Sequence, residues 1–333
     1  MEFGIWNDVG KTRIIKISKK VRHNFTILFV SNNDDPSSNG TPRTKLILRG
    51  TECFVHRWTN AVQPKGVAVI YHGFLAHGNY PTVRYVAELL ESANYAVVAV
   101  DLPGHGRSGG MRGYVPSEHA LVEDGVQIAH YADNLYENKL PLFLVGSSLG
   151  GAIALSASKK MNMNMNISAN SISDRLAGVV LLAPMLALNV AEPLRYVLKG
   201  LSFLVPTIQL ISSSATSSAK QYRDADKRRE CDDDDLTVSG AKLRVASAAA
   251  CVNLAAETRA SLSDVDIPFL CMVANEDVVV KNEGSFELME KSPSLDKTLK
   301  QYDALHGLFC EPAPLIDQIQ LDLLSWVNHR CKN

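Results

Sequence analysis

Short, continuous apolar runs alternate with stretches of helical spacing from about residue 43 to the C-terminus. A strand that helices cover on both faces is apolar along its whole length, whereas a half-exposed strand alternates apolar and polar residues. The pattern therefore predicts an α/β fold with a buried, mostly parallel sheet and helices on both faces. The predicted buried runs begin at Gly66, Tyr95, Pro141, Ala177, Ile267 and Thr298.

Three segments interrupt this alternation. Residues 1–42 precede it and end in the turn-rich stretch Ser31–Pro42, which predicts a partly disordered extension. The low-complexity stretch Met161–Ser173 predicts a solvated insertion. The third segment, residues 187–252, is longer and mostly helical, and it predicts a second layer over the strand ends; the charge run Arg223–Asp235 within it predicts a solvated loop. We therefore divide the chain into an N-terminal extension (1–42), a core (43–186 and 253–333) and a helical cap, or lid (187–252).

Charge and cysteine usage narrow the class of protein. A net charge of −1 gives no electrostatic reason to expect a nucleic-acid partner. The six cysteines lack metal-site spacing, and the N-terminus lacks the apolar centre of a signal peptide. These features predict a cytoplasmic protein. The apolar stretch Leu194–Ile211 of the cap has two open interpretations, a layer packed on the core or a lid that contacts membranes.

The stretch GSSLGG follows one of the predicted strands and precedes a predicted helix. A nucleophile on a tight strand-to-helix turn has a strained backbone, and the residues two positions away on either side crowd one another. Gly146 and Gly150 occupy those places around Ser148, whereas the corresponding neighbours of Ser147 are a valine and a leucine. The spacing therefore selects Ser148 as the nucleophile.

A serine nucleophile needs a histidine base that is oriented by an acid, and in this setting the chain order is serine, acid, histidine. Two histidines come late enough, and His306 follows a predicted strand whereas His329 lies in an amphipathic terminal helix. The strand end near residue 277 offers Glu276 and Asp277, of which Asp277 lies where the loop turns. Asp266 precedes that strand and would lie at the wrong end of the sheet.

The oxyanion of the reaction needs two preorganised N–H donors. The backbone N–H of Leu149, just after the nucleophile, is one candidate, and that of Phe74, in the loop YHGFLAHG, is the other. His72 and Gly73 are expected to shape this loop, and His72 is predicted to be a structural, hydrogen-bonded histidine. His105 lies in a second glycine-rich loop, GHGRS, and is likewise assigned to the structure of the site.

These motifs together resemble the monoacylglycerol lipase and lysophospholipase group of the α/β-hydrolase superfamily. The resemblance covers about residue 45 to the C-terminus, and Asp235 with Leu236 resembles the Asp-Pro-Leu of the family. Three departures are a serine at position 147, the absence of a glycine before the acid, and Thr237 in place of the proline. The matching pieces are HGF, DLPGHGRSGGMRGYVPS, GSSLGGAIAL, LLAPM, ED-VVV and YDALHGLFCEP.

The resemblance implies an eight-stranded sheet, a cap inserted between two strands, and hydrolysis of one acyl ester in a lipid-like or aromatic alcohol. It implies no cofactor and no metal. The expected partner is a small lipid ester, with transient membrane contact through the cap as an option, and the oligomeric state stays open. Two alternatives remain open: a caffeoylshikimate-type or general carboxylesterase, and a small-molecule receptor of the same fold with little turnover.

Overall fold

The computed structural model describes residues 13–17, 27–31, 45–60, 63–163, 172–211, 217–237 and 242–331. Most of the expected extension lies outside these residues, as do residues 164–171 of the expected insertion. Within the extension, β1 (Arg13–Ile17) and β2 (Ile27–Ser31) pair as an antiparallel ribbon, which the sequence pattern alone did not place.

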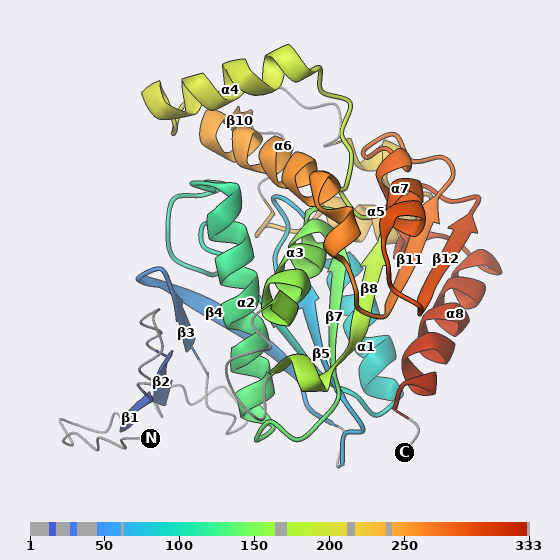
Figure 1. Cartoon of the computed structure of the whole chain (residues 1–333). Coiled ribbons are helices and arrows are strands. Elements are labelled where there is room, and N and C mark those ends of the chain that lie inside the picture. The colour runs from blue at the N-terminus through green and yellow to red at the C-terminus, as the bar shows by residue number, and fades with distance from the viewer. Residues whose placement is uncertain are drawn as a thin grey trace.

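An eight-stranded sheet forms the centre of the molecule, in the order β12-β11-β8-β7-β5-β6-β4-β3 (Figure 1). The pairs β3–β4 and β4–β6 are antiparallel and the others are parallel, which confirms the expected mostly parallel sheet. The strands are β3 (Lys45–Leu48), β4 (Thr51–Trp58), β5 (Val67–Tyr71), β6 (Ala96–Val100), β7 (Leu142–Ser147), β8 (Leu176–Leu182), β11 (Phe269–Ala274) and β12 (Lys297–Tyr302).

Helices cover both faces of this sheet and explain why its central strands are apolar throughout. Val69 of β5 packs in the same core cluster as Ile153, on the face of α2 and α3. Its neighbour Ile70 packs with Val86 and Leu323, on the face of α1 and α8. The core helices are α1 (Pro81–Ser92), α2 (Glu118–Leu135), α3 (Leu149–Met163), α7 (Glu283–Lys291) and α8 (Leu315–His329).

The cap region lies beyond the carboxyl ends of the parallel strands (Figure 1). It contains α4 (Glu192–Leu204), α5 (Ala225–Asp232), the antiparallel pair β9 (Gln209–Ile211) and β10 (Leu243–Arg244), and α6 (Val245–Ala260). Short 3₁₀ turns lie at Ile172–Arg175, Ser218–Lys220, Leu262–Asp264 and Leu308–Cys310.

The predicted end of the cap at residue 252 falls inside a continuous helix, α6. The second half of α6 packs on the core, where the hydroxyls of Ser156 and Thr258 lie 2.8 Å apart. The alanine-rich sequence contains no glycine or proline that would mark a boundary there. The division into cap and core stays a prediction, and α6 belongs to both parts.

Candidate active site

Ser148 occupies the sharp turn between β7 and α3, with a φ of +55°. This left-handed conformation is costly for a residue with a Cβ atom, so the surroundings must hold it. The Ser148 N–H donates to the Leu182 carbonyl at 3.0 Å, and the Ser148 carbonyl accepts the Met185 N–H at 2.9 Å. These contacts come from the last residue of β8 and from the loop that follows it, which together fix the turn.

The two glycines around Ser148 are required by close packing of backbone on backbone. A Cβ atom on Gly146 would lie 2.1 Å from the Gly150 carbonyl oxygen, and one on Gly150 would lie 2.0 Å from the Tyr71 carbonyl oxygen. Real Cβ contacts do not approach so closely. The expected crowding is therefore present at Gly146, which packs on Gly150, whereas Gly150 itself packs on the backbone at the end of β5. Both glycines flank Ser148 and not Ser147.

His306 and Asp277 meet at the carboxyl ends of β12 and β11. Their side chains are joined by a hydrogen bond of 2.7 Å between His306 Nδ1 and Asp277 Oδ2. The Asp277 carboxylate is shielded from solvent, and its Oδ1 accepts the N–H groups of Val279 at 2.8 Å and Val280 at 3.0 Å. Three hydrogen bonds therefore hold the carboxylate in one orientation, with His306 Nε2 left for a second partner.

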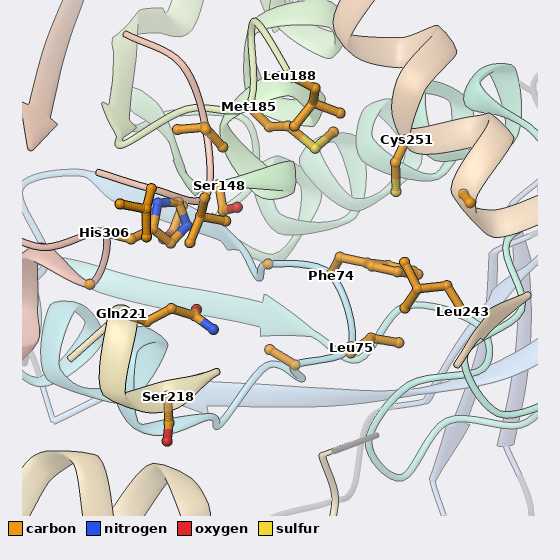
Figure 2. Close-up of a pocket in the computed structure, with 18 of the residues that line it drawn as sticks. Phe74, Leu75, Ser148, Met185, Leu188, Ser218, Gln221, Leu243, Cys251 and His306 are labelled. Atoms are coloured by element: carbon orange, nitrogen blue, oxygen red, sulfur yellow. The ribbon is translucent and has the colours of Figure 1, made fainter. Parts of the chain in front are cut away.

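Ser148 and His306 both line one cavity of about 530 Å³, shown in Figure 2. Among the described residues, no hydrogen bond joins the Ser148 hydroxyl to the His306 ring. Catalytic hydrogen bonds are commonly long or misaligned before substrate binds. Apolar side chains supply much of the rest of the wall, including Phe74, Leu75, Met185, Leu188, Leu198, Leu243, Val279 and Val280.

The two expected oxyanion donors come from the loops after β5 and β7. Leu149 is the first residue of α3, so its N–H has no partner within the helix. In the part of the chain that the structure describes, neither the Leu149 nor the Phe74 N–H donates to another protein group. Gly73 lies beside the nucleophile, since a Cβ atom there would be 3.7 Å from that of Ser148.

His72 ties the Phe74 loop to the loop after β6. Its Nδ1 donates to the Gly73 carbonyl at 2.7 Å, and its Nε2 accepts the Leu102 N–H at 3.1 Å. Burial lowers the pKa of His72 to about 3, so the ring is neutral at physiological pH. His105 packs on this ring at 5.2 Å between centroids, and burial lowers its pKa to about 4. Both rings are therefore buried and uncharged at physiological pH, and their assignment to the structure of the site stays a prediction.

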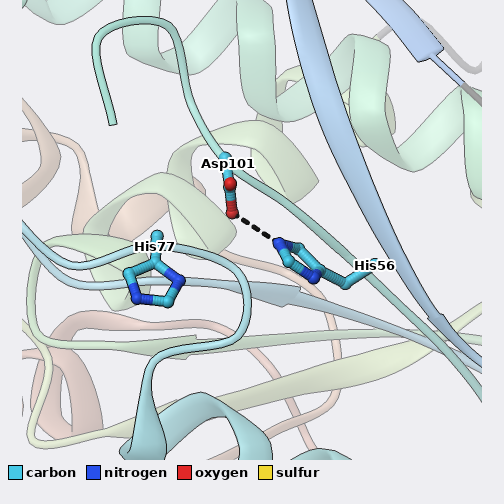
Figure 3. Close-up of side chains that lie close together, drawn as sticks. All are labelled: His56, His77 and Asp101. Carbon is cyan, nitrogen blue, oxygen red and sulfur yellow. Dashed lines mark hydrogen bonds and ion pairs between the residues drawn. The ribbon is translucent and has the colours of Figure 1, made fainter. Parts of the chain in front are cut away.

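His56, His77 and Asp101 form a second cluster of potential metal-binding side chains (Figure 3). None of the three lines the cavity. The Asp101 oxygens that could bind a metal ion are already bonded to other groups of the protein. One Asp101 oxygen pairs with His56 Nε2 at 2.7 Å and also accepts the Gly78 N–H at 2.6 Å. The other accepts the Arg107 N–H at 2.7 Å. We interpret the cluster as a brace between two loops, because a metal ion would have to break these bonds.

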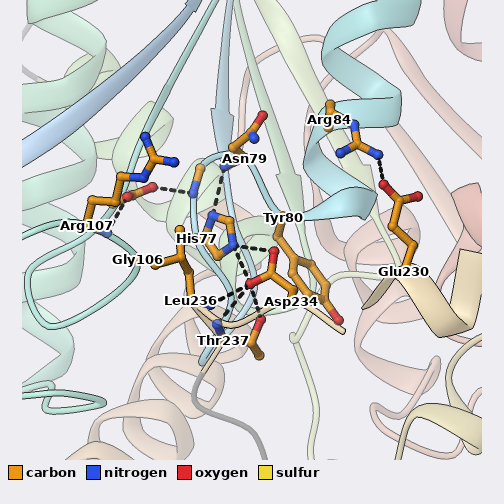
Figure 4. Close-up of polar contacts among 12 residues, drawn as sticks. His77, Asn79, Tyr80, Arg84, Gly106, Arg107, Glu230, Asp234, Leu236 and Thr237 are labelled. Atoms are coloured by element: carbon orange, nitrogen blue, oxygen red, sulfur yellow. Dashed lines mark hydrogen bonds and ion pairs between the residues drawn. The ribbon is translucent and has the colours of Figure 1, made fainter. Parts of the chain in front are cut away.

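His77 also connects the core to the cap, a contact that the sequence did not predict (Figure 4). Its Nδ1 accepts the Asn79 N–H at 3.2 Å, so its Nε2 carries the proton that is donated to Asp234 at 2.9 Å. Asp234 Oδ1 in turn accepts the N–H groups of Leu236 and Thr237 at 2.9 and 3.0 Å. The aspartate that anchors the cap is therefore Asp234, whereas the neighbouring Asp235, which the sequence comparison with the family motif had singled out, is exposed.

The charge run Arg223–Asp235 is only partly the solvated loop that the sequence predicted. It forms helix α5, buries Cys231 and anchors the cap through Asp234. A charge-rich run favours solvent on average, and it contains no local signal that tells anchoring charges from exposed ones.

A strained serine after a buried strand, a histidine–aspartate pair and two available N–H groups define a serine hydrolase of the α/β-hydrolase fold. The model of the family described as serine aminopeptidase, S33, matches residues 62–313. The chain belongs to this family and, within it, to the monoacylglycerol lipase group, which makes it a carboxylic ester hydrolase.

Relatives at sequence and structure level agree with this membership. A monoglyceride lipase of Mus musculus is 30% identical, covering 84% of this chain and 88% of that protein. The phospholipase YtpA of Bacillus subtilis is 27% identical, covering 77% of this chain and 93% of that protein. A soluble variant of the monoglyceride lipase of Saccharomyces cerevisiae, solved with a substrate analog, has the same fold. Its TM-score is 0.73 at 18% identity, covering 90% of this chain and 99% of that one.

Proposed function

We propose that this protein hydrolyses the ester bond of monoacylglycerols, with lysophospholipids as the less favoured substrate. The observation that carries the proposal is the opening of Ser148 and His306 onto a largely apolar cavity beneath the cap. An acyl chain gains free energy when it leaves water for such a wall, and the ester carbonyl would then lie beside the serine.

The first half of the proposed reaction is acylation. Ser148 Oγ attacks the ester carbonyl carbon while His306 Nε2 takes the hydroxyl proton. The charge that develops on the carbonyl oxygen is stabilised by the N–H groups of Phe74 and Leu149. Asp277 stays ionised and stabilises the imidazolium through the bond to Nδ1.

Acylation is completed when the tetrahedral intermediate collapses: the imidazolium of His306 gives its proton to the departing alcohol oxygen, glycerol leaves as a neutral molecule, and Ser148 keeps the acyl group. The second half of the proposed reaction, deacylation, frees the acyl group. A water molecule, deprotonated by His306, then attacks the acyl-serine carbonyl. The tetrahedral intermediate collapses to release the fatty acid and restore Ser148, and no step calls for a cofactor.

The charges around the cavity favour a neutral alcohol over a phosphate-bearing one. Among the described residues that line it there is no lysine or arginine, whereas Asp232 contributes an acidic group. A phosphate that left water for this wall would have no cationic partner there and would face like charge. Glycerol carries no charge and needs only hydrogen-bonding groups, which Gln221 and Asn189 on the wall provide.

We therefore expect kcat/KM for a long-chain monoacylglycerol to exceed that for the matching lysophosphatidylcholine by at least about tenfold. These two substrates are measured beside a short p-nitrophenyl ester and a hydroxycinnamoyl ester. Product release is followed for all four esters at equal ionic strength. Equal or better turnover of the lysophospholipid would contradict the charge argument. Preference for the hydroxycinnamoyl ester would favour the alternative function of a caffeoylshikimate-type esterase. No turnover of any ester would favour the alternative of a small-molecule receptor with the same fold.

The cap helix α4 supports a proposal of membrane contact. Leu198 is buried and faces the cavity, whereas Phe203 and Leu204 at the end of the helix are each 78% exposed. Tyr196 and Val197 are also exposed. In the described residues no helix has both the length and the apolarity that spanning a bilayer requires. We propose that the outer face of α4 rests on the membrane surface while its inner face lines the acyl-chain site.

The double variant Phe203→Ser, Leu204→Ser is expected to weaken binding to lipid vesicles by about tenfold, because two apolar side chains no longer enter the interface. Binding is measured by co-sedimentation with phosphatidylcholine vesicles. The matched control, Leu295→Ser with Leu321→Ser, removes two exposed leucines that lie outside the cap. If both double variants bind like the wild type, α4 is not the contact surface.

A further inference from the structure

The cap segment Gln221–Lys227 is hydrogen-bonded to the loop that carries His306. We call residues 303–311 the base loop and residues 275–280 the acid loop. The Gly307 N–H donates to the Gln221 carbonyl at 2.8 Å, and the Asp224 N–H donates to the Cys310 carbonyl at 2.9 Å. The Lys227 ammonium adds a bond to the Phe309 carbonyl at 3.1 Å. The cap and the base loop are therefore one hydrogen-bonded unit.

Glu311 holds the base loop from within. Its side chain is fully buried, and its Oε1 accepts the N–H of Leu305 at 2.7 Å. Leu305 directly precedes His306, so this bond fixes the backbone from which the imidazole projects. Burial raises the pKa of Glu311, because a carboxylate that is removed from water is destabilised unless a cation lies nearby.

Arg223 of the cap is that cation. Its Nε lies 2.9 Å from Glu311 Oε2, in an ion pair that opposes the effect of burial on the Glu311 pKa. Its Nη2 donates to Glu276 Oε1 at 2.7 Å. Glu276 directly precedes Asp277. The guanidinium of Arg223 therefore links two groups next to the triad. One is Glu276, which precedes the catalytic acid, and the other is the carboxylate of Glu311, which holds the backbone just before the catalytic base.

We propose that Arg223 and Glu311 are positioning residues, which set the distance and orientation between His306 and Asp277. Neither side chain touches the reacting atoms. Because Arg223 belongs to the cap, the base is placed correctly only while the cap segment is docked, so the cap contributes to the rate as well as to substrate choice. This inference rests on the proposed function, in which His306 is the base.

A second ion pair between core and cap provides a control, because it attaches the cap without a bond to the acid loop or the base loop among the described residues. Arg84 of α1 and Glu230 of α5 also form an ion pair between core and cap (Figure 4). The Tyr85 hydroxyl donates to the same carboxylate. Neither residue is bonded to the acid loop or the base loop in the described structure. A variant of Glu230 loosens the same junction without touching the backbone next to the triad.

The test uses steady-state kinetics on a short p-nitrophenyl ester, with the full chain and the variants Arg223→Met, Arg223→Lys, Glu311→Gln and Glu230→Gln. Arg223→Met and Glu311→Gln are expected to lower kcat on the order of 10-fold to 100-fold, with KM changed by less than about threefold. Arg223→Lys should recover part of the loss, since it keeps the charge but not the two-sided geometry. Glu230→Gln should keep kcat within about twofold.

A second readout separates positioning from general loss of structure. The proton on His306 Nδ1, hydrogen-bonded to Asp277, gives a far-downfield NMR resonance that should shift or broaden in Arg223→Met and Glu311→Gln but not in Glu230→Gln. An unchanged resonance and unchanged kcat in both variants would overturn the proposal. Equal kcat losses in Arg223→Met and Glu230→Gln would also overturn it, because attachment of the cap alone would then explain the effect.

The same assay distinguishes failure of this inference from failure of the proposed function. Ser148→Ala is measured beside the other variants. If Ser148→Ala retains turnover, the serine mechanism itself is wrong. If Ser148→Ala is inactive while Arg223→Met and Glu311→Gln turn over like the wild type, the mechanism stands and only the positioning role is lost.

Discussion

Replacing Ser148 with alanine is expected to lower kcat on monoacylglycerol by at least about 10⁴-fold, because in the proposed reaction the Ser148 hydroxyl forms the acyl-enzyme. Residual turnover would come from the oxyanion donors and the binding cavity alone. Folding should be unaffected or slightly improved, since the substitution removes a hydroxyl and keeps the Cβ atom that already tolerates the φ of +55°. Product release by chromatography, with a thermal melt for folding, measures both effects.

Ser147→Ala is the matched control for this prediction. Ser147 is the adjacent serine and also lines the cavity, but its neighbours two positions away are not glycines. Its loss should change kcat by less than about tenfold, through the shape of the cavity wall. If Ser147→Ala were the inactive variant and Ser148→Ala the active one, the argument from glycine spacing would be wrong.

The elements that the sequence predicted well are those with a local physical signature. The buried strands were visible because both of their faces pack against helices, as Val69 and Ile70 illustrate. The strained turn at Ser148 was visible because backbone crowding demands Gly146 and Gly150 at fixed spacing, and the role of Ser148 as nucleophile stays a prediction. Chain order then limited the acid and base to a few residues, and the structure joins the two selected, His306 and Asp277.

The residues that the sequence did not reveal act through partners far away in the chain. His77 bonds to Asp234, which is 157 residues distant, and Arg223 reaches both Glu276 and Glu311. No periodicity or spacing connects such pairs. Two of these residues also lie in a charge-rich run, where solvation is the usual outcome. Only the tertiary structure shows which of those charges are anchored to the core.

These long-range contacts give the cap a role that its apolar composition did not indicate. The cap is attached to the loop of the proposed oxyanion donor through His77, and to the loop of the proposed base through Arg223 and Lys227. A cap that only covered the acyl chain would need apolar contacts, not ion pairs with loops of the triad. The contacts therefore favour a site whose catalytic geometry depends on the docked cap.

The proposed role of Asp277 as the acid of the triad can be tested by a single substitution, because backbone N–H groups fix the orientation of its carboxylate. In Asp277→Asn the amide oxygen should stay at Oδ1, where the N–H groups of Val279 and Val280 donate. The amide NH₂ then occupies the Oδ2 position and faces His306 Nδ1, 2.7 Å away. A donor there requires an acceptor at Nδ1, so the ring must carry its proton on Nε2 and can no longer take the serine proton.

We therefore expect Asp277→Asn to lower kcat by about 10⁴-fold at neutral pH while KM changes little. Steady-state kinetics on the p-nitrophenyl ester measures kcat, and a thermal melt verifies that the variant is folded. Asp266→Asn is the control, because this exposed aspartate precedes β11 and lies at the opposite end of that strand from the triad. It should behave like the wild type. A loss of less than about tenfold in Asp277→Asn would show that another group orients His306. Glu276, which precedes Asp277 in the chain and accepts a hydrogen bond from Arg223, would be the first residue to replace.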